Sequence, residues 1–170
     1  MSITNKGAAA GTAAGTKELP KIFYIQRMQP RGFVLDVYQN NPASNQQVIA
    51  YAPHGGTNQQ WEFVPAESPG WWYLRTRMGT GFVATLDVSS RNIVMAQPAG
   101  GSRDEQLWCL VPTSAPGYWF IQSKLDVSNS VDANVIGITN NASTPDAVAV
   151  SLDYKGFENQ AWAFAPMYEP

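Results

Sequence analysis

The chain repeats one short motif three times, and this repeat limits its possible folds more than any other feature. The motif is Gln-x-Trp, and it stands at residues 59–61, 106–108 and 160–162, about 50 residues apart. Self-similarity at a regular spacing marks an architecture built from equivalent units. We therefore expect three similar lobes arranged about one axis.

The similarity extends well beyond the motif. The segments WEFVPAESPGWWYLRTR, from Trp61, and WCLVPTSAPGYWFIQSK, from Trp108, match at the first Trp, a Val, two Pro, a Gly and a second Trp. The third copy is divided between the two ends of the sequence, because WAFAPMYEP starts at Trp162 and PKIFYIQRM, from Pro20, supplies the second half. The repeat thus closes across the termini.

Within each unit, short segments rich in β-branched and aromatic residues alternate with Gly, Pro, Asn and Ser clusters, which is typical of all-β structure. About four strands fit in each unit, so we predict twelve strands in a closed all-β fold with few exposed edges. The low-complexity stretch GAAAGTAAGT indicates a flexible arm over residues 1–19, followed by a single domain at 20–170. The expected lobes span about 20–68, 69–115 and 116–170.

The composition favours a neutral polar partner. Charged residues make up 14% of the chain and the net charge is −2, so no basic surface for nucleic acid is expected. The single cysteine, Cys109, excludes an internal disulfide, and the N-terminus lacks the apolar run of a signal peptide. We expect a cytoplasmic protein with no membrane insertion.

With its three Gln-x-Trp motifs, the sequence over residues 20–170 resembles the ricin B-type lectin family, and most closely its small cytoplasmic mushroom members. The resemblance implies a β-trefoil in which Trp61, Trp108 and Trp162 are structural core residues. It also implies a non-catalytic lectin for galactose or N-acetylgalactosamine glycans, with no cofactor and no metal.

A sugar presents hydroxyl groups and one apolar face, so its site needs a carboxylate, an amide and an aromatic ring. In the first lobe, the resemblance assigns these roles to Asp36, to an outward-facing Asn58 and to Tyr51 as the stacking ring, with Gln59 behind them. The alternative is structural, because an Asp near a turn often caps backbone N–H groups and a loop Tyr often only packs.

The second lobe aligns Asp87 with Asp36 but places Ala96 at the Tyr51 position and Glu105 at the Asn58 position. Without a ring, and with a carboxylate in place of an amide, this lobe is not expected to bind sugar.

The third lobe is a second candidate site, with Asn159 and Gln160 matching the amides of the first lobe. The spacing from Gln122 equals the spacing from Gln26 to Asp36 if Asp132 is the carboxylate. The stacking position falls near Leu152, so this lobe is either a site or plain surface.

The sequence gives little support for a histidine-based site or a metal site. His54 precedes two glycines and is expected on a solvated turn, and the Asp and Ser residues between 126 and 132 lack the pattern of a calcium loop. The competing class is a β-trefoil protease inhibitor that acts through surface loops. Because single sugar sites are weak, we expect avidity from two lobes or from a homodimer.

Overall fold

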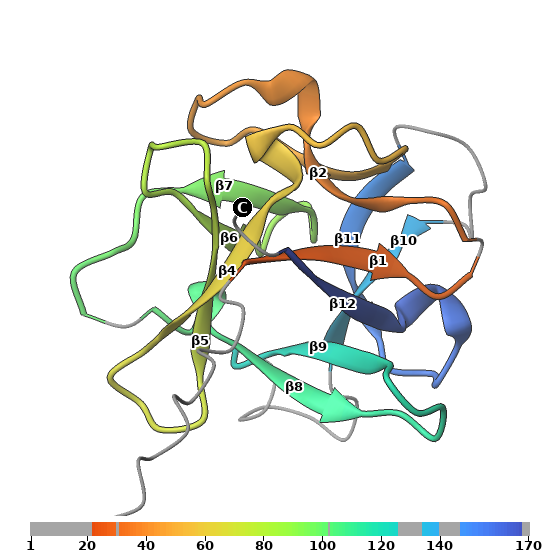
Figure 1. The fold of residues 1–170 in the computed structure, drawn as a ribbon. Helices are drawn as coiled ribbons and strands as arrows, with labels where there is room; N and C mark the ends of the chain where they lie inside the picture. Colours follow the sequence, from red (N-terminus) through yellow and green to blue (C-terminus); the bar gives the residue numbers. More distant parts are fainter. Residues whose placement is uncertain (1–21, 30, 102, 126–133, 140–146, 168–170) are drawn as a thin grey trace, which may run out of the picture.

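The computed structural model describes residues 22–29, 31–101, 103–125, 134–139 and 147–167. The predicted N-terminal arm and the candidate Asp132 lie outside these residues. Within them the secondary structure consists of β-strands and single 3-10 turns (Figure 1). No helix in the described part of the chain is long and apolar enough to cross a membrane.

Six strands close into a barrel. They are β1 (Ile22–Arg27), β4 (Trp61–Pro65), β5 (Trp72–Thr76), β8 (Trp108–Pro112), β9 (Trp119–Ser123) and β12 (Trp162–Met167). Each strand pairs antiparallel with the next one, and the pairing of β12 with β1 completes the ring. The first and last strands of the fold are therefore neighbours, as the divided third repeat predicts.

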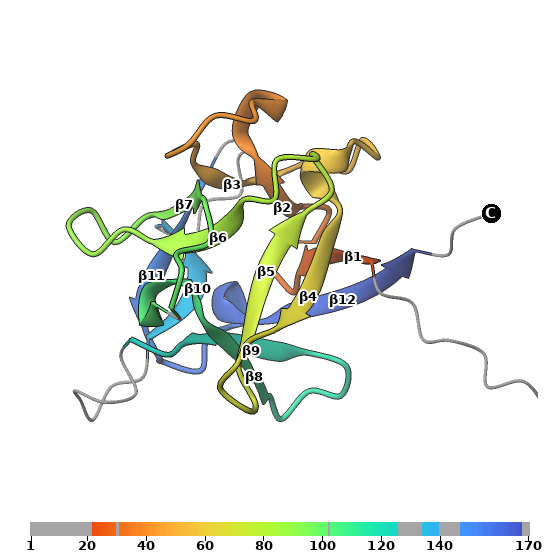
Figure 2. The ribbon, with the colours of Figure 1, turned by 90° about the vertical axis from the view of Figure 1, so that its left-hand side faces the viewer.

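Three hairpins cover one end of this barrel, and their strands are labelled in Figure 2. They are β2 (Val34–Val37) with β3 (Val48–Tyr51), β6 (Val83–Leu86) with β7 (Ile93–Ala96), and β10 (Asn134–Ile138) with β11 (Ala147–Asp153). The hairpins also contact one another, because β3 pairs with β11 and β7 forms a bridge with Gln47. Six barrel strands and three hairpins make the β-trefoil that the sequence predicts, and the predicted fold class is confirmed.

Each Gln-x-Trp motif forms the same local structure, a 3-10 turn followed by the start of a barrel strand. The turns are η2 (Thr57–Gln59), η3 (Asp104–Gln106) and η5 (Glu158–Gln160), and the strands are β4, β8 and β12. The three tryptophans have no exposed surface, and the three glutamines are buried beside them. The motif thus fixes both the core and the loop above it.

The indole N–H groups define which residues correspond in the three lobes. Trp61 donates to the carbonyl of Leu35, Trp108 to that of Ala84 and Trp162 to that of Ile136, at 2.9, 3.0 and 2.8 Å. Moving one residue along each hairpin strand, Asp36, Thr85 and Gly137 occupy equivalent positions. This equivalence decides what chemistry each lobe carries.

Candidate functional site

A pocket of about 370 Å³ opens in the first lobe, at the end of the hairpin formed by β2 and β3. Strand β2 contributes Asp36, strand β3 contributes Ile49 and Tyr51, and the loop before β4 contributes His54 and Asn58. The structure therefore brings together the carboxylate, the ring and the amide that the sequence singled out. Gln59 lies directly behind them.

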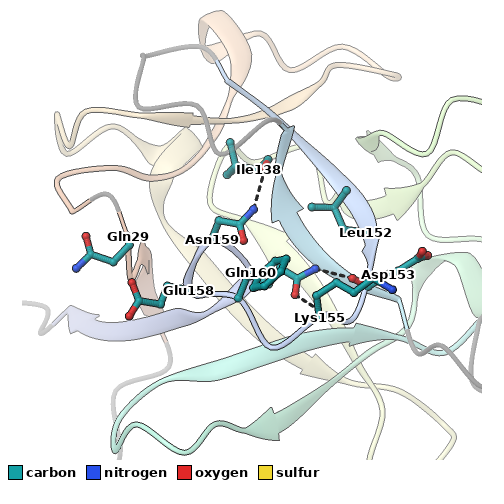
Figure 3. A pocket seen from close by; sticks show the side chains of 9 residues that line it. Gln29, Ile138, Leu152, Asp153, Lys155, Glu158, Asn159 and Gln160 are labelled. Atoms are coloured by element: carbon teal, nitrogen blue, oxygen red, sulfur yellow. Dashed lines mark hydrogen bonds between the residues drawn. The ribbon is translucent and has the colours of Figure 1, made fainter.

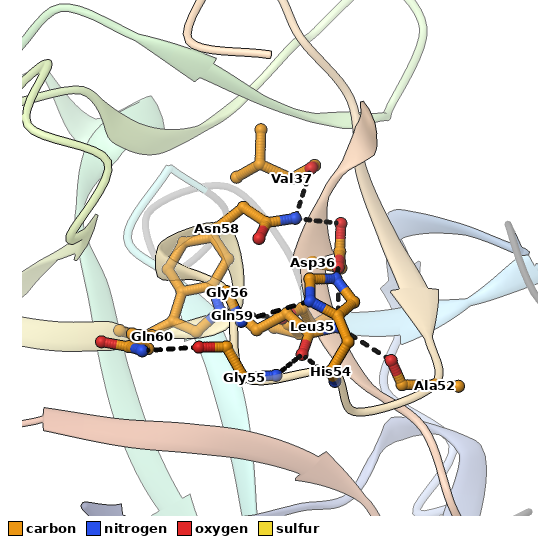
Figure 4. A network of polar contacts seen from close by, with 11 residues as sticks. Leu35, Asp36, Val37, Ala52, His54, Gly55, Gly56, Asn58, Gln59 and Gln60 are labelled. Atoms are coloured by element: carbon orange, nitrogen blue, oxygen red, sulfur yellow. Dashed lines mark hydrogen bonds and ion pairs between the residues drawn. The ribbon is translucent and has the colours of Figure 1, made fainter. Parts of the chain in front are cut away.

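Asp36 is the centre of this site, and three side chains donate to its carboxylate (Figure 4). Asn58 Nδ2 lies 2.9 Å from Oδ1, and Gln59 Nε2 lies 2.7 Å from Oδ2. His54 Nε2 lies 3.1 Å from the same Oδ2. Only 2% of Asp36 is exposed, so the carboxylate is a buried group held in one orientation.

Burial sets the ionisation of this carboxyl. It raises the pKa of Asp36, because removal from water disfavours the charged form, while the hydrogen bonds from Gln59, His54 and Asn58 act in the opposite direction. A buried carboxylate with several donors costs free energy that a surface cap would not. Asp36 therefore differs from an exposed Asp that only caps a turn.

Gln59 is the brace behind the carboxylate. Its amide nitrogen also donates to the carbonyl of Ala52, and its oxygen accepts the backbone N–H groups of His54 and Gly55. All polar atoms of this side chain are in use, so it fixes the loop from 52 to 55 relative to Asp36. Gln59 thus lies behind Asp36, the candidate carboxylate.

Asn58 differs from the expectation that it faces outward. It is only 2% exposed, and its nitrogen donates to the carbonyl of Val37 as well as to Asp36. Its oxygen is buried and has no hydrogen-bond partner among the described residues. A Cβ added to Gly56 would lie 2.5 Å from this oxygen, so the glycine is needed for the close approach of the loop. Asn58 positions the carboxylate and shows little surface.

Tyr51 forms the exposed wall of the pocket at the end of β3. The residue is 37% exposed, and its ring meets the His54 ring edge-on, with centroids 6.0 Å apart. Tyr51 and Ile49 alternate along β3 and therefore present their side chains on one face of the hairpin. An apolar surface thus stands beside a buried carboxylate, as a sugar requires.

Two features of this pocket were missed by the sequence analysis. His54 is not a freely solvated turn residue, because its ring contacts Asp36. The sequence offered one indication of this contact: His54 lies five residues before Gln59, in the loop that the glutamine holds. The 3-10 turn η1 (Tyr38–Asn40) forms another wall. Within it Gln39 and Asn40 have φ values of 57° and 51°. Asn adopts this left-handed backbone conformation more readily than most residues, but an Asn-rich sequence alone does not predict where it occurs.

The second lobe lacks the carboxylate. Thr85 occupies the Asp36 position, and its hydroxyl oxygen lies 3.2 Å from Gln106 Nε2. The alignment of Asp87 with Asp36 is therefore wrong. Asp87 is exposed and accepts hydrogen bonds from Ser89 and Ser90, which lower its pKa to about 2. It caps a turn, the structural role that an Asp near a turn often has.

In the third lobe no described residue places a carboxylate at the Asp36 position. Gly137 occupies that position, because a longer connection precedes β10 in this lobe. The count that placed Asp132 there therefore does not hold, and Asp132 itself lies outside the described residues. A Cβ at Gly137 would lie 2.7 Å from Leu152 Cδ1. Leu152 stands at the Tyr51 position and fills the space that a carboxylate would need.

Asn159 and Gln160 occupy positions equivalent to Asn58 and Gln59, although Gly137 offers them no carboxylate (Figure 3). Gln160 donates to the carbonyl of Asp153, as Gln59 does to that of Ala52. Asn159 reaches the carbonyl of Ile138 at 3.4 Å. A larger hollow of about 700 Å³ lies here, lined by Leu152, Phe157 and Lys155 among others. Asp153 and Glu158 also line it, but neither stands at the position equivalent to Asp36.

The fold defines a β-trefoil protein, and a polar pocket of about 370 Å³ lies in its first lobe. The chain belongs to the ricin-type β-trefoil lectin domain-like family, whose sequence profile matches residues 12–96. The match spans the whole first lobe and its pocket. A search of curated protein sequences finds no significant match.

Solved structures share the fold. The designed threefold-symmetric protein ThreeFoil is 23% identical with a TM-score of 0.72, over 86% of this chain and 99% of that one. The C-half of an earthworm R-type lectin, solved in complex with GalNAc, is 21% identical with a TM-score of 0.66, over 87% and 100%. The Rhizoctonia solani agglutinin is 15% identical with a TM-score of 0.68, over 91% and 100%. At these identities the likeness concerns the fold.

Proposed function

We propose that this protein is a non-catalytic lectin that binds galactose or N-acetylgalactosamine residues of glycans through the first lobe alone. The observation that carries the proposal is the buried Asp36, held by Asn58, Gln59 and His54 at the base of a pocket with an exposed tyrosine. Lectin membership and the GalNAc complex of the earthworm relative support it.

The acceptor capacity of Asp36 fits two neighbouring hydroxyl groups. A carboxylate has about four lone-pair positions, two on each oxygen. Oδ1 accepts one hydrogen bond and therefore keeps a free position, whereas Oδ2 accepts two. The donor to Oδ2 that can yield is His54, because its side chain is 43% exposed while Gln59 is fully buried. A sugar would bond to Oδ1 and displace His54 from Oδ2.

The ring of Tyr51 would cover the apolar C–H face of the same sugar, and Ile49 would form the floor. Stacking supplies the net burial, since the polar groups only exchange water for sugar. A single site of this kind binds weakly. We infer that useful binding needs several glycans on one surface, and a homodimer would supply a second site. We also propose a cytoplasmic location.

The decisive experiment compares Asp36→Asn with Asp87→Asn in titrations against lactose. Asp36→Asn should lower the affinity by about 10- to 100-fold, because it removes charge-assisted hydrogen bonds. Asp87→Asn is the matched control, since that residue only caps a turn in the second lobe, and it should bind as the wild type does.

Two results would contradict the proposal. One is unchanged lactose affinity in Asp36→Asn. The other is a wild-type protein that passes lactose and galactose resins unretained and gives no signal on a glycan array. Stoichiometric inhibition of a papain-like or trypsin-like protease would then favour the inhibitor class.

A further inference from the structure

One wall of the first-lobe pocket is the turn η1, whose residues Tyr38, Gln39 and Asn40 all line the pocket. Tyr38 is half-buried, and Gln39 and Asn40 are exposed at the rim. Among the described residues, neither of these two side-chain amides has a hydrogen-bond partner. The turn therefore presents one ring and two unpaired amide groups to the occupant of the pocket.

The backbone of this turn adopts a conformation that its side chains disfavour. Gln39 and Asn40 have φ values of 57° and 51°, in the left-handed region. Glycine enters this region at the lowest cost, and a glutamine is uncommon there. Strained residues gather at ligand sites, and here the strain coincides with the rim of the pocket.

The connection that carries this turn is anchored at two points. The backbone N–H of Tyr38 donates to the carbonyl of Gln47 at 3.0 Å, next to the start of β3. Farther along, the backbone N–H of Asn45 donates to the carbonyl of Met95 in β7 at 2.8 Å. These bonds tie the connection to its own hairpin and to the second lobe. The turn consequently needs little further ordering when a ligand binds.

The hairpin of the second lobe is closed by a shorter connection of different structure. Residues 87–92 join β6 and β7, whereas residues 38–47 join β2 and β3. The shorter connection turns at Asp87, whose carboxylate accepts hydrogen bonds from Ser89 and Ser90. The longer connection, with its amide-bearing turn, thus stands in the lobe that has the buried carboxylate.

The groups on η1 match those of an acetamido substituent. A primary amide offers N–H donors and a carbonyl acceptor side by side, and an acetamido group offers one N–H and one carbonyl in return. The methyl group of the substituent needs an apolar surface, which the Tyr38 ring supplies. A hydroxyl group would use only part of these partners. The turn therefore favours an N-acetylated sugar over one with a hydroxyl at the same place.

We propose that η1 recognises an acetamido group on the glycan whose galactose-type ring binds Asp36. Gln39 and Asn40 form hydrogen bonds with its N–H and carbonyl, and the Tyr38 ring contacts its methyl group. The acetamido group belongs either to the sugar in the pocket, as in N-acetylgalactosamine, or to the next sugar, as in N-acetyllactosamine. This inference rests on the proposed function of the first lobe and narrows its ligands to N-acetylated glycans.

The test is a set of titrations of the full chain with galactose, N-acetylgalactosamine, lactose and N-acetyllactosamine. We expect at least one N-acetylated ligand to bind about 5- to 20-fold more tightly than its counterpart, as one or two net hydrogen bonds provide. A gain for N-acetylgalactosamine over galactose places the acetamido group on the sugar in the pocket. A gain for N-acetyllactosamine over lactose places it on the next sugar. The absence of both gains would overturn the inference.

The critical variants are Gln39→Gly and Asn40→Gly, because glycine adopts positive φ freely and keeps the turn while the amide is lost. The readout is the ratio of the affinities for the preferred N-acetylated ligand and for its counterpart. This ratio should fall in at least one of the two variants and approach one in the double variant. A double variant that keeps the wild-type ratio would overturn the inference.

Asn45→Gly is the matched control. Asn45 is exposed and has a φ of 63° in the same connection, but it does not line the pocket. Its replacement makes the same change of residue type and backbone freedom, so the ratio should stay at the wild-type value. A ratio that falls equally in Asn45→Gly would mean that the mobility of the connection, and not the amides of η1, sets the preference.

Gln39→Glu and Asn40→Asp serve as a second pair, in case glycine loosens the turn. Each keeps the size of the side chain and replaces the amide donors by a carboxylate, which repels the acetamido carbonyl. The ratio should again fall in at least one of them, while urea unfolding matches that of the wild type. A ratio that both variants keep would contradict the inference.

Failure of this inference is distinguishable from failure of the proposed function. Galactose and lactose binding that depends on Asp36, without a gain from the acetamido group, overturns only the inference. If none of the four ligands binds, the proposed function fails and the inference is overturned with it.

Discussion

Asp36 shows how burial changes what the substitution of an acidic residue is expected to do. An exposed carboxylate could be replaced with little effect on stability, which is what a sequence-based view of a surface sugar site suggests. The observed carboxylate is buried and satisfies three donors, so Asp36→Asn also turns an amide toward at least one of them. A stability loss of about 1–3 kcal/mol would therefore accompany the loss of binding.

The ionisation of Asp36 predicts how binding depends on pH. Sugar hydroxyls need the charged carboxylate as acceptor, so binding should fall as the pH drops through the pKa of Asp36. Burial raises this pKa, and the hydrogen bond and the charge of His54 lower it. His54→Gln removes the lowering effect of the charge, so binding should be lost at a higher pH than in the wild type. Lactose titrations from acid to neutral pH check the order of the two midpoints.

A midpoint that stays in place, or moves to lower pH, in His54→Gln would contradict the assigned contact. Asp36→Asn serves as the control, because its weak binding should not change in the range where the carboxyl titrates.

For the residues of the first-lobe pocket, the sequence predicted which residue types come together but not which side chains are buried. Asp36, Tyr51 and Asn58 do meet in one pocket. The inward turn of Asn58 and the contact of His54 with Asp36 depend on a loop path that Gly56 permits, and no periodicity in the sequence reports such a path.

The turn of the Gln-x-Trp motif is the element that all three lobes share. Its glutamine binds the loop above it in each lobe, through carbonyls of Ala52, Gln97 and Asp153. Among the described residues, the glutamine also binds a carboxylate only in the first lobe. The turn thus has the same structural role in three lobes and borders the candidate site in one.

This distinction predicts different outcomes for two equivalent substitutions. Gln59→Ala and Gln106→Ala should each lower the free energy of unfolding by about 1–3 kcal/mol, because each strands buried backbone groups. Only Gln59→Ala should also weaken lactose binding, since it releases Asp36. Urea unfolding and lactose titration of both variants give the comparison. Equal loss of binding in the two would mean that the second lobe binds as well.

The hairpin strands explain where sequence counting succeeded and where it did not. Counting back from the motif places Leu152 at the Tyr51 position, because the connections between these two strands and the following Trp are equal in length. In the second lobe that connection is longer, and it is the strand pairing that places Ala96 there. Counting forward from the barrel strand fails in the third lobe, since the chain between β9 and β10 is longer than that between β1 and β2. Hydrogen bonds to the indoles were needed to show that Gly137 is the equivalent of Asp36.

For the whole molecule, the three tryptophans are equivalent supports of one core. Each is fully buried and bonded to a hairpin strand, so Trp61→Ala, Trp108→Ala and Trp162→Ala should each cost about 3–5 kcal/mol. Urea unfolding followed by circular dichroism measures these losses. A variant that melts like the wild type would contradict the role of its tryptophan in the core.

The pairing of β1 with β12 has a consequence for how the chain reaches its native state. One edge of β1 pairs with β4, but the other edge pairs with β12, which lies at the far end of the described chain. Contacts between residues so distant in sequence are slow to form. During synthesis the barrel cannot close until the last strand has left the ribosome, so the ring should assemble late and as a unit.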